Sequence, residues 1–248
     1  MKNILFFFAL ILLGCTQEPA QTVVSPLEDA VRAYRARQND LSPSAVLEWL
    51  KAGNDRFRTG SSIHGGYVKD ARERIRVAAS GQRPLAAILS CIDSRTSPEM
   101  AFDTSVGDLF TMRVAANVVN EDIIGSLEIA VESGARTIVV MGHTDCGGIK
   151  GACSNLELGH LTQLIARVKP AIQMAHAHLD ADPALSQLVG ERVVTNRRYI
   201  AEVSHANAQQ SARQIRERSE ILREKLDSQE ITLISAVYNV DTGEVLFD

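Results

Sequence analysis

His143 and Cys146 lie three positions apart in the stretch MGHTDCGG (residues 141–148), which begins at the end of an apolar run. Cys91 directly follows a separate apolar run, LAAILS (residues 85–90). Thiolate and imidazole groups together suit zinc, and a set of two cysteines and one histidine leaves the fourth tetrahedral position open, as in catalytic zinc sites. The alternative is a buried cysteine, a loop histidine and an unrelated second cysteine.

Asp93 and Arg95 follow Cys91 in the stretch CIDSR. Arg95 could keep the Asp93 carboxylate ionised and fix its orientation, so that Asp93 reaches a metal or the water beside it. The alternative is an ordinary surface ion pair, which contributes little. Next to a metal, we expect the pair to orient the groups around the ion, as residues outside the ligand set do in metal sites.

Two other kinds of catalytic site fail on residue identity. A cysteine phosphatase requires Cys-x₅-Arg, and Ser97 stands where the arginine would follow Cys91. A phosphate-binding P-loop requires a lysine after its second glycine. Gly142 and Gly147 have the right spacing, but Gly148 occupies the lysine position.

The pattern of apolar runs and helical periodicities predicts an α/β fold, with a central, mostly parallel β-sheet flanked by helices. Long helices lie at the N-terminal end of the domain, and Asp241-Thr242-Gly243 indicates a C-terminal hairpin. Expected strands cover residues 85–91, 108–119 and 136–143, and expected helices cover 43–57, 67–81, 120–133, 158–180 and 199–227.

Catalytic sites of such sheets form beyond the carboxyl ends of the strands. Cys91 and His143 each stand at the end of a predicted buried strand. If these strands are neighbours, the two residues and Cys146 meet at one edge of the sheet.

The N-terminus, MKNILFFFALILLGC, has a basic residue followed by a short apolar run, which is typical of a secretory signal peptide. LLGC also resembles the bacterial lipobox, in which the cysteine, here Cys15, is acylated. We therefore expect a signal peptide at 1–14, a lipid-anchored tether and leading helical segment at 15–41, and the catalytic domain at 42–248. The protein would be exported to the periplasmic side of the envelope, with the outer membrane favoured because Thr16 is not the aspartate that often retains lipoproteins at the inner membrane.

Composition narrows the class of protein further. The formal net charge is −4 and no basic block is present, which excludes a basic nucleic-acid-binding face. Of the four cysteines, three remain if Cys15 carries lipid, and this odd number argues against a disulfide framework.

The combination of CIDSR with GHTDCGGIKGAC (residues 142–153) resembles the β-class carbonic anhydrases. GNDRF in the leading helix, GDLF, GSLE and the closing YNVDTGEV extend the similarity from about Pro43 to the C-terminus.

The resemblance implies a β-carbonic-anhydrase-like fold and reversible hydration of carbon dioxide to bicarbonate by a zinc enzyme. Cys91, His143 and Cys146 would bind Zn²⁺, and Asp93 would either occupy the fourth position or orient the water there, with Arg95 as its partner. Gln82 would hydrogen-bond substrate and Phe110 would line the carbon dioxide pocket. The family also implies a homodimer or tetramer, with Gln82 and Phe110 facing the neighbouring subunit's zinc.

Two alternatives keep the same metal residues. One is a hydrolase of carbonyl sulfide or carbon disulfide, and the other is a non-catalytic envelope lipoprotein with a structural zinc. An intact Asp93–Arg95 pair argues against the second, because a closed structural site does not need it.

Overall fold

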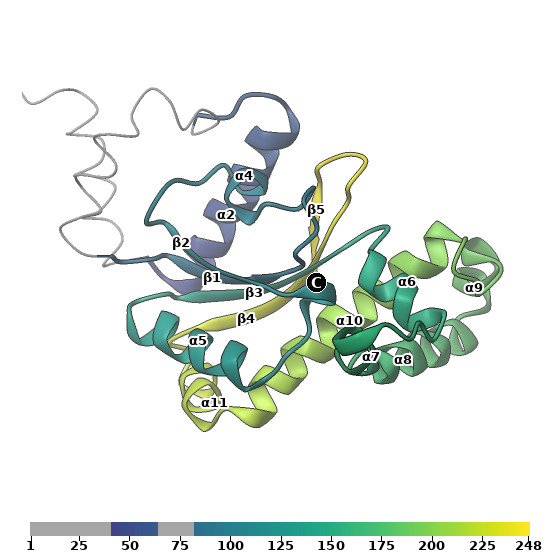
Figure 1. Cartoon of the computed structure of the whole chain (residues 1–248). Helices are drawn as coiled ribbons and strands as arrows, with labels where there is room; N and C mark the ends of the chain where they lie inside the picture. Colours follow the sequence, from purple (N-terminus) through teal and green to yellow (C-terminus); the bar gives the residue numbers. More distant parts are fainter. Residues whose placement is uncertain (1–40, 64–81) are drawn as a thin grey trace, which may run out of the picture. The chain divides into compact units, whose positions relative to one another are not determined.

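A five-stranded β-sheet forms the centre of the computed structural model, which describes residues 41–63 and 82–248 (Figure 1). The strand order is β2-β1-β3-β4-β5; the first four strands are parallel and β5 runs antiparallel to β4. This arrangement confirms the predicted α/β class. The strands are β1 (Ala86–Ser90), β2 (Leu109–Arg113), β3 (Thr137–His143), β4 (Thr232–Tyr238) and β5 (Val245–Phe247).

Strands β1 and β3 are buried along their whole length. Their sequences are apolar without interruption because helices cover both faces of a parallel sheet, so side chains on both faces are buried. The α2 helix (Pro43–Arg58) packs with α4 (Pro98–Ala101) on one face, while α5 (Glu121–Glu132), α10 (Arg197–Arg218) and α11 (Glu220–Asp227) cover the other (Figure 1).

A second group of helices continues the chain beyond the carboxyl end of β3. Its members pack on one another and on α10 (Figure 1). They are α6 (Gly147–Cys153), α7 (Gly159–Ala166), α8 (Lys169–Ala181) and α9 (Pro183–Val189). A buried apolar cluster joins this group to the residues that follow β1 and β3, and it includes Cys91 and Cys146.

Local signals set two helix boundaries as expected. The Ser42 side chain accepts from the Ala45 amide at 3.2 Å and begins α2. Asn120 accepts from the Ile123 amide at 2.9 Å and begins α5, and Gly134, with φ of 110°, follows its end.

Both long helices expected downstream are divided in the structure. The helix expected at 158–180 breaks after Ala166, because Pro170, in the first turn of α8, has no N–H to continue the preceding helix. The helix expected at 199–227 breaks at Ser219, whose hydroxyl accepts from the Leu222 amide at 3.1 Å and caps α11.

The strand expected at 108–119 was also too long. It ends at Arg113, and residues Ala115–Asn117 form a single 3₁₀ turn with left-handed backbone at Ala116 and Asn117. The C-terminal hairpin is confirmed, with Gly243 at φ of 74° between β4 and β5. The helix expected at 67–81 and the signal segment with Cys15 lie outside the described residues.

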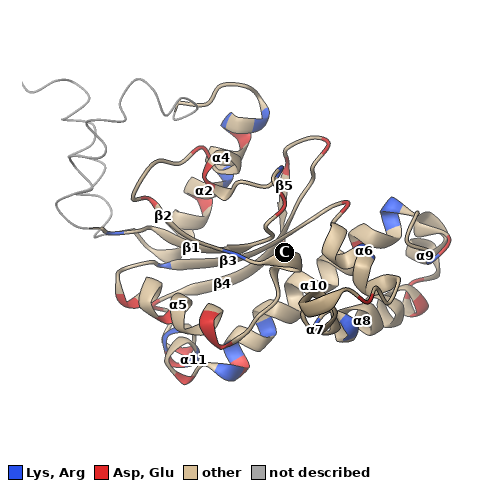
Figure 2. Ribbon diagram, in the orientation of Figure 1, with Lys and Arg blue, Asp and Glu red and all other residues tan. Residues whose placement is uncertain are grey.

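Charges of both signs are interspersed around α11 and α9 rather than gathered by sign (Figure 2). Within residues 41–63 and 82–248, no helix is long and apolar enough to cross a membrane.

Candidate metal centre

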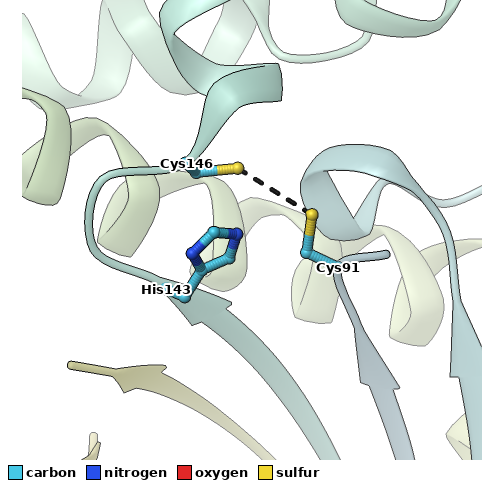
Figure 3. A group of neighbouring side chains, drawn as sticks. All are labelled: Cys91, His143 and Cys146. Atoms are coloured by element: carbon cyan, nitrogen blue, oxygen red, sulfur yellow. Dashed lines mark hydrogen bonds between the residues drawn. The ribbon is translucent and has the colours of Figure 1, made fainter. Parts of the chain in front are cut away.

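Cys91, His143 and Cys146 point toward one another at one edge of the sheet (Figure 3). Cys91 directly follows β1, His143 is the last residue of β3, and Cys146 precedes the first residue of α6. Their ligand atoms all lie within 4.8 Å of one another, and all three residues are buried. The predicted meeting of the three side chains is confirmed, because β1 and β3 are parallel neighbours whose carboxyl ends coincide.

The three side chains have the geometry of a metal site. The two sulfur atoms are 4.0 Å apart, and two thiolates bound tetrahedrally at about 2.3 Å would lie about 3.8 Å apart. His143 Nδ1 donates to the Thr144 carbonyl at 2.9 Å, which leaves the lone pair on Nε2. Within the described residues, this buried Nε2 has no hydrogen-bond partner. A metal ion would satisfy it.

The two cysteine sulfurs affect each other's ionisation in opposite directions. A hydrogen bond from Cys146 lowers the pKa of Cys91, and the same hydrogen bond, together with burial, raises the pKa of Cys146. The amides of Gly148 and Ile149, at the start of α6, act in the opposite direction on Cys146 and favour its thiolate. A cation between the sulfurs would favour the thiolate form of both cysteines.

Asp93 lies beside this cluster and is held by Arg95. Arg95 donates from Nε to Oδ1 at 2.9 Å and from its terminal nitrogen to Oδ2 at 2.8 Å, and its backbone amide reaches Oδ1 at 3.0 Å. These bonds hold the pKa of Asp93 well below its usual range. Asp93 Oδ2 is 3.9 Å from His143 Nε2. The carboxylate is therefore ionised and adjacent to the ligand atoms.

Asp145 is a part of the site that sequence reasoning missed. It lies between His143 and Cys146 with φ of 59°, a conformation that aspartate tolerates better than most residues. Its carboxylate accepts from Lys150, which lowers the pKa of Asp145, and it lies 3.5 Å from Arg95. The sequence signal that could have identified Asp145 is its position between the two predicted ligands His143 and Cys146.

Arg113 was also missed. At the end of β2, its side chain donates to the carbonyls of Cys91 at 2.9 Å and Asp93 at 2.6 Å. Arg113 thus fixes the backbone of the segment that carries the first ligand and the carboxylate. Because these bonds go to main-chain atoms, which every residue has, no sequence motif predicts them.

Gln82 and Phe110 are not brought to the three metal-binding candidates within one chain. Gln82 is exposed and precedes β1, whereas Cys91 follows that strand. Phe110 is half-buried in β2, opposite Ala87, and packs against the cluster on the α5 side of the sheet. If they serve substrate, they serve it in a neighbouring subunit.

Comparison with known proteins agrees with this geometry. Residues 86–245 match the family described as carbonic anhydrase. The chain is 28% identical to carbonic anhydrase 2 of Mycobacterium tuberculosis over 211 residues, covering 83% of this chain and 92% of the relative. It is 30% identical to the carbonic anhydrase of Mycolicibacterium smegmatis over 210 residues, covering 82% and 92%.

Among solved structures, a tetrameric β-carbonic anhydrase of Sordaria macrospora has the same fold, with a TM-score of 0.61 at 22% identity, covering 72% of this chain and 88% of that one. Fold and site define an α/β metalloenzyme with its centre at the carboxyl ends of parallel strands. The chain belongs to the β-class carbonic anhydrases, enzymes that interconvert carbon dioxide and bicarbonate.

Proposed function

We propose that the protein hydrates carbon dioxide reversibly with one zinc ion held by Cys91, His143 and Cys146. One observation carries this proposal: three buried donors converge on one point, and the buried Nε2 of His143 has no other partner in the described part of the chain. Zinc supplies Lewis-acid chemistry, activating water as a nucleophile near neutral pH.

The donor set favours zinc over magnesium and calcium. Magnesium and calcium prefer oxygen ligands, whereas two thiolates and an imidazole suit a tetrahedral zinc ion. Three protein ligands leave one position for chemistry, and the two thiolates would neutralise the charge of the ion. The protein therefore has to supply the remaining control of the reacting water through neighbouring side chains.

Asp93 is suited to that control. Arg95 keeps it ionised, so that Asp93 accepts a hydrogen bond and does not donate one. An acceptor fixed beside the ligand atoms orients the nucleophilic water toward carbon dioxide. Arg113 holds the backbone of Asp93, and Arg95 holds its side chain, so the acceptor position is fixed at two points.

The assembly we propose is a homodimer, which can pair into a tetramer. In the five-stranded order, β2 is an edge strand, and such an edge is open to pairing or covering. Large apolar side chains near it face outward in the single chain: Ile92 is 60% exposed, Met100 55% and Val106 44%. A neighbouring subunit would cover these side chains. In such a dimer, Gln82 and Phe110 of each subunit would face the metal centre of the other. The related Sordaria enzyme is tetrameric.

The location we propose is the periplasmic side of the bacterial envelope. The motif LLGC and the polar, proline-containing stretch after it support acylation at Cys15, followed by a tether. Several acyl chains anchor a protein stably where a single chain does not.

Stopped-flow measurement of carbon dioxide hydration against pH, with zinc measured on the same sample, tests the proposed function. We expect hydration activity that scales with zinc content up to one ion per chain. A zinc-loaded protein that hydrolyses carbonyl sulfide but does not hydrate carbon dioxide would favour the alternative reaction at the same site.

A further inference from the structure

The 3₁₀ turn Ala115–Asn117 is strained next to the metal centre. Ala116 and Asn117 have φ values of 56° and 42°, in the left-handed region that residues with a β-carbon rarely adopt. Two consecutive residues of this kind persist only where the surroundings determine their conformation, and such positions gather at functional sites. Both residues are buried, so the surroundings are protein.

The turn directs a backbone donor at one of the metal-binding candidates. The Ala116 amide donates to Cys91 Sγ at 3.4 Å, in the protein interior. A thiolate that accepts an N–H hydrogen bond gives less electron density to its metal, and such outer bonds tune metal sites. The strained conformation thus places the Ala116 amide where it can donate to Cys91 Sγ.

Asn207 and Ser211 of α10 each donate to a different carbonyl of the turn. Asn207 Nδ2 donates to the Ala116 carbonyl at 2.7 Å, and Ser211 Oγ donates to the Asn117 carbonyl at 3.1 Å. The two residues are one helical turn apart on the same face and are 1% and 3% exposed. Each bond joins residues more than 90 positions apart in the chain.

Two glycines allow the elements around the turn to approach closely. A β-carbon at Gly142 of β3 would lie 3.0 Å from the Ser204 carbonyl oxygen, so the absence of a side chain at Gly142 eases the close approach of α10 to the sheet. A β-carbon at Gly148 of α6 would lie 2.9 Å from that of Ala116 and 3.2 Å from its nitrogen. The turn is therefore held between α6 and α10.

We propose that Asn207 is a positioning residue of the metal centre: by holding the Ala116 carbonyl, it directs the Ala116 amide at Cys91 Sγ and sets how strongly this thiolate donates to the metal. The inference rests on the proposed role of Cys91 as a metal ligand. If Asn207 merely satisfied a buried carbonyl, its loss would change stability but leave the sulfur's bonding to the metal unchanged.

Cobalt substitution distinguishes these two roles, because cobalt bound by thiolate gives a sulfur-to-metal charge-transfer band. We expect the full-length Asn207→Ala protein, loaded with cobalt, to shift this band to lower energy, because a thiolate without its hydrogen bond gives up electrons more easily. The matched control, Ser211→Ala, removes the neighbouring bond from the same helix face. That bond goes to the carbonyl of Asn117 and not to that of Ala116, the residue whose amide reaches Cys91, so the band should stay in place. Where Asn207→Ala fails to fold, Asn207→Ser serves instead: it keeps a polar group, but its side chain is one bond shorter, and it should show the same shift.

An unshifted band in a folded, cobalt-loaded Asn207 variant would overturn the proposal, as would an equal shift in Ser211→Ala. If wild-type protein binds cobalt without any sulfur band, the ligand set itself is wrong, and that result contradicts the proposed function instead.

Discussion

Arg95 binds both carboxylate oxygens of Asp93, at 2.9 and 2.8 Å. One of these oxygens, Oδ2, is 3.9 Å from His143 Nε2. The pair thus lies beside the three metal-binding candidates, and this position favours the proposed role in the site over that of an ordinary surface ion pair. Because Arg95 lowers the pKa of Asp93, the carboxylate is an acceptor throughout the physiological pH range.

The first prediction concerns this acceptor. Asp93→Asn should keep its zinc, because the three ligands remain, but lose activity by about 10- to 100-fold, because the amide no longer provides the same oriented acceptor. Zinc content and carbon dioxide hydration are measured on one sample. Asp241→Asn is the control, since Asp241 is an exposed partner of Arg197. Wild-type turnover in Asp93→Asn would show that Asp93 has no part in the reaction.

The second prediction compares two cysteines at the two ends of α6. Cys146→Ser should lose most of its bound zinc, because solvent cannot replace a buried thiolate. Cys153→Ser should bind zinc normally, because Cys153 is at the far end of α6 and outside the ligand cluster. Metal analysis after dialysis measures both. Equal zinc content in the two variants would contradict the assignment.

The third prediction concerns the assembly. Val106→Glu should weaken the dimer and reduce activity, because it places a charge on an exposed apolar residue beside the edge strand β2. Leu188→Glu, on an even more exposed apolar residue of α9, should leave both unchanged. Light scattering measures the mass of each. We expect an interface beyond about 2,000 Å² in total, as in obligate dimers. A fully active wild-type monomer at micromolar concentration would rule this assembly out.

The fourth prediction concerns membrane attachment. Cys15→Ala should move the protein from the membrane to the soluble fraction, because acylation at this cysteine is the proposed anchor. Fractionation of cells followed by immunoblotting measures the distribution. If the variant remains with the membranes, the anchor lies elsewhere.

The fifth prediction concerns stability against pH. Burial opposes ionisation of Asp248, but hydrogen bonds from Ser235, His205 and Gln209 outweigh it and lower the pKa of Asp248. A lowered folded-state pKa stabilises the fold above the unfolded value of about 4, and this contribution is lost as the pH falls through the folded pKa.

Asp248→Asn should therefore lower the melting temperature by about 3 °C or more at pH 7, and the difference from wild type should shrink below pH about 4. Asp227→Asn, which removes an exposed ion pair with Arg216, should change little at either pH. A difference that grows on acidification would contradict the sign of the pKa shift.

The sequence allowed prediction of the elements that rest on local signals. The apolar runs predicted β1 and β3, and Asn120 and Gly134 bounded α5, because burial on both faces and capping leave direct traces in composition. The placement of Cys91, His143 and Cys146 followed from the parallel order of these strands. Periodicity continues across helix breaks, so the breaks before Pro170 and at Ser219 were missed although both residues carry a boundary signal.

Contacts between distant segments left no such trace. Asn207 is one of several polar residues in a helix, and only the fold shows that it reaches Ala116. Arg113 reaches main-chain carbonyls, which any residue provides. The proposed roles of Gln82 and Phe110 would require a second subunit, because the single chain does not bring these residues to the three metal-binding candidates.

X-ray absorption at the zinc edge of the active enzyme tests the central claim most directly, because it counts the atoms bound to the ion. Two sulfur ligands at about 2.3 Å with nitrogen or oxygen ligands at about 2.0–2.1 Å are predicted, from Cys91, Cys146, His143 and the open position. A zinc ion without sulfur ligands, or one bound by four sulfurs, would contradict the proposed centre.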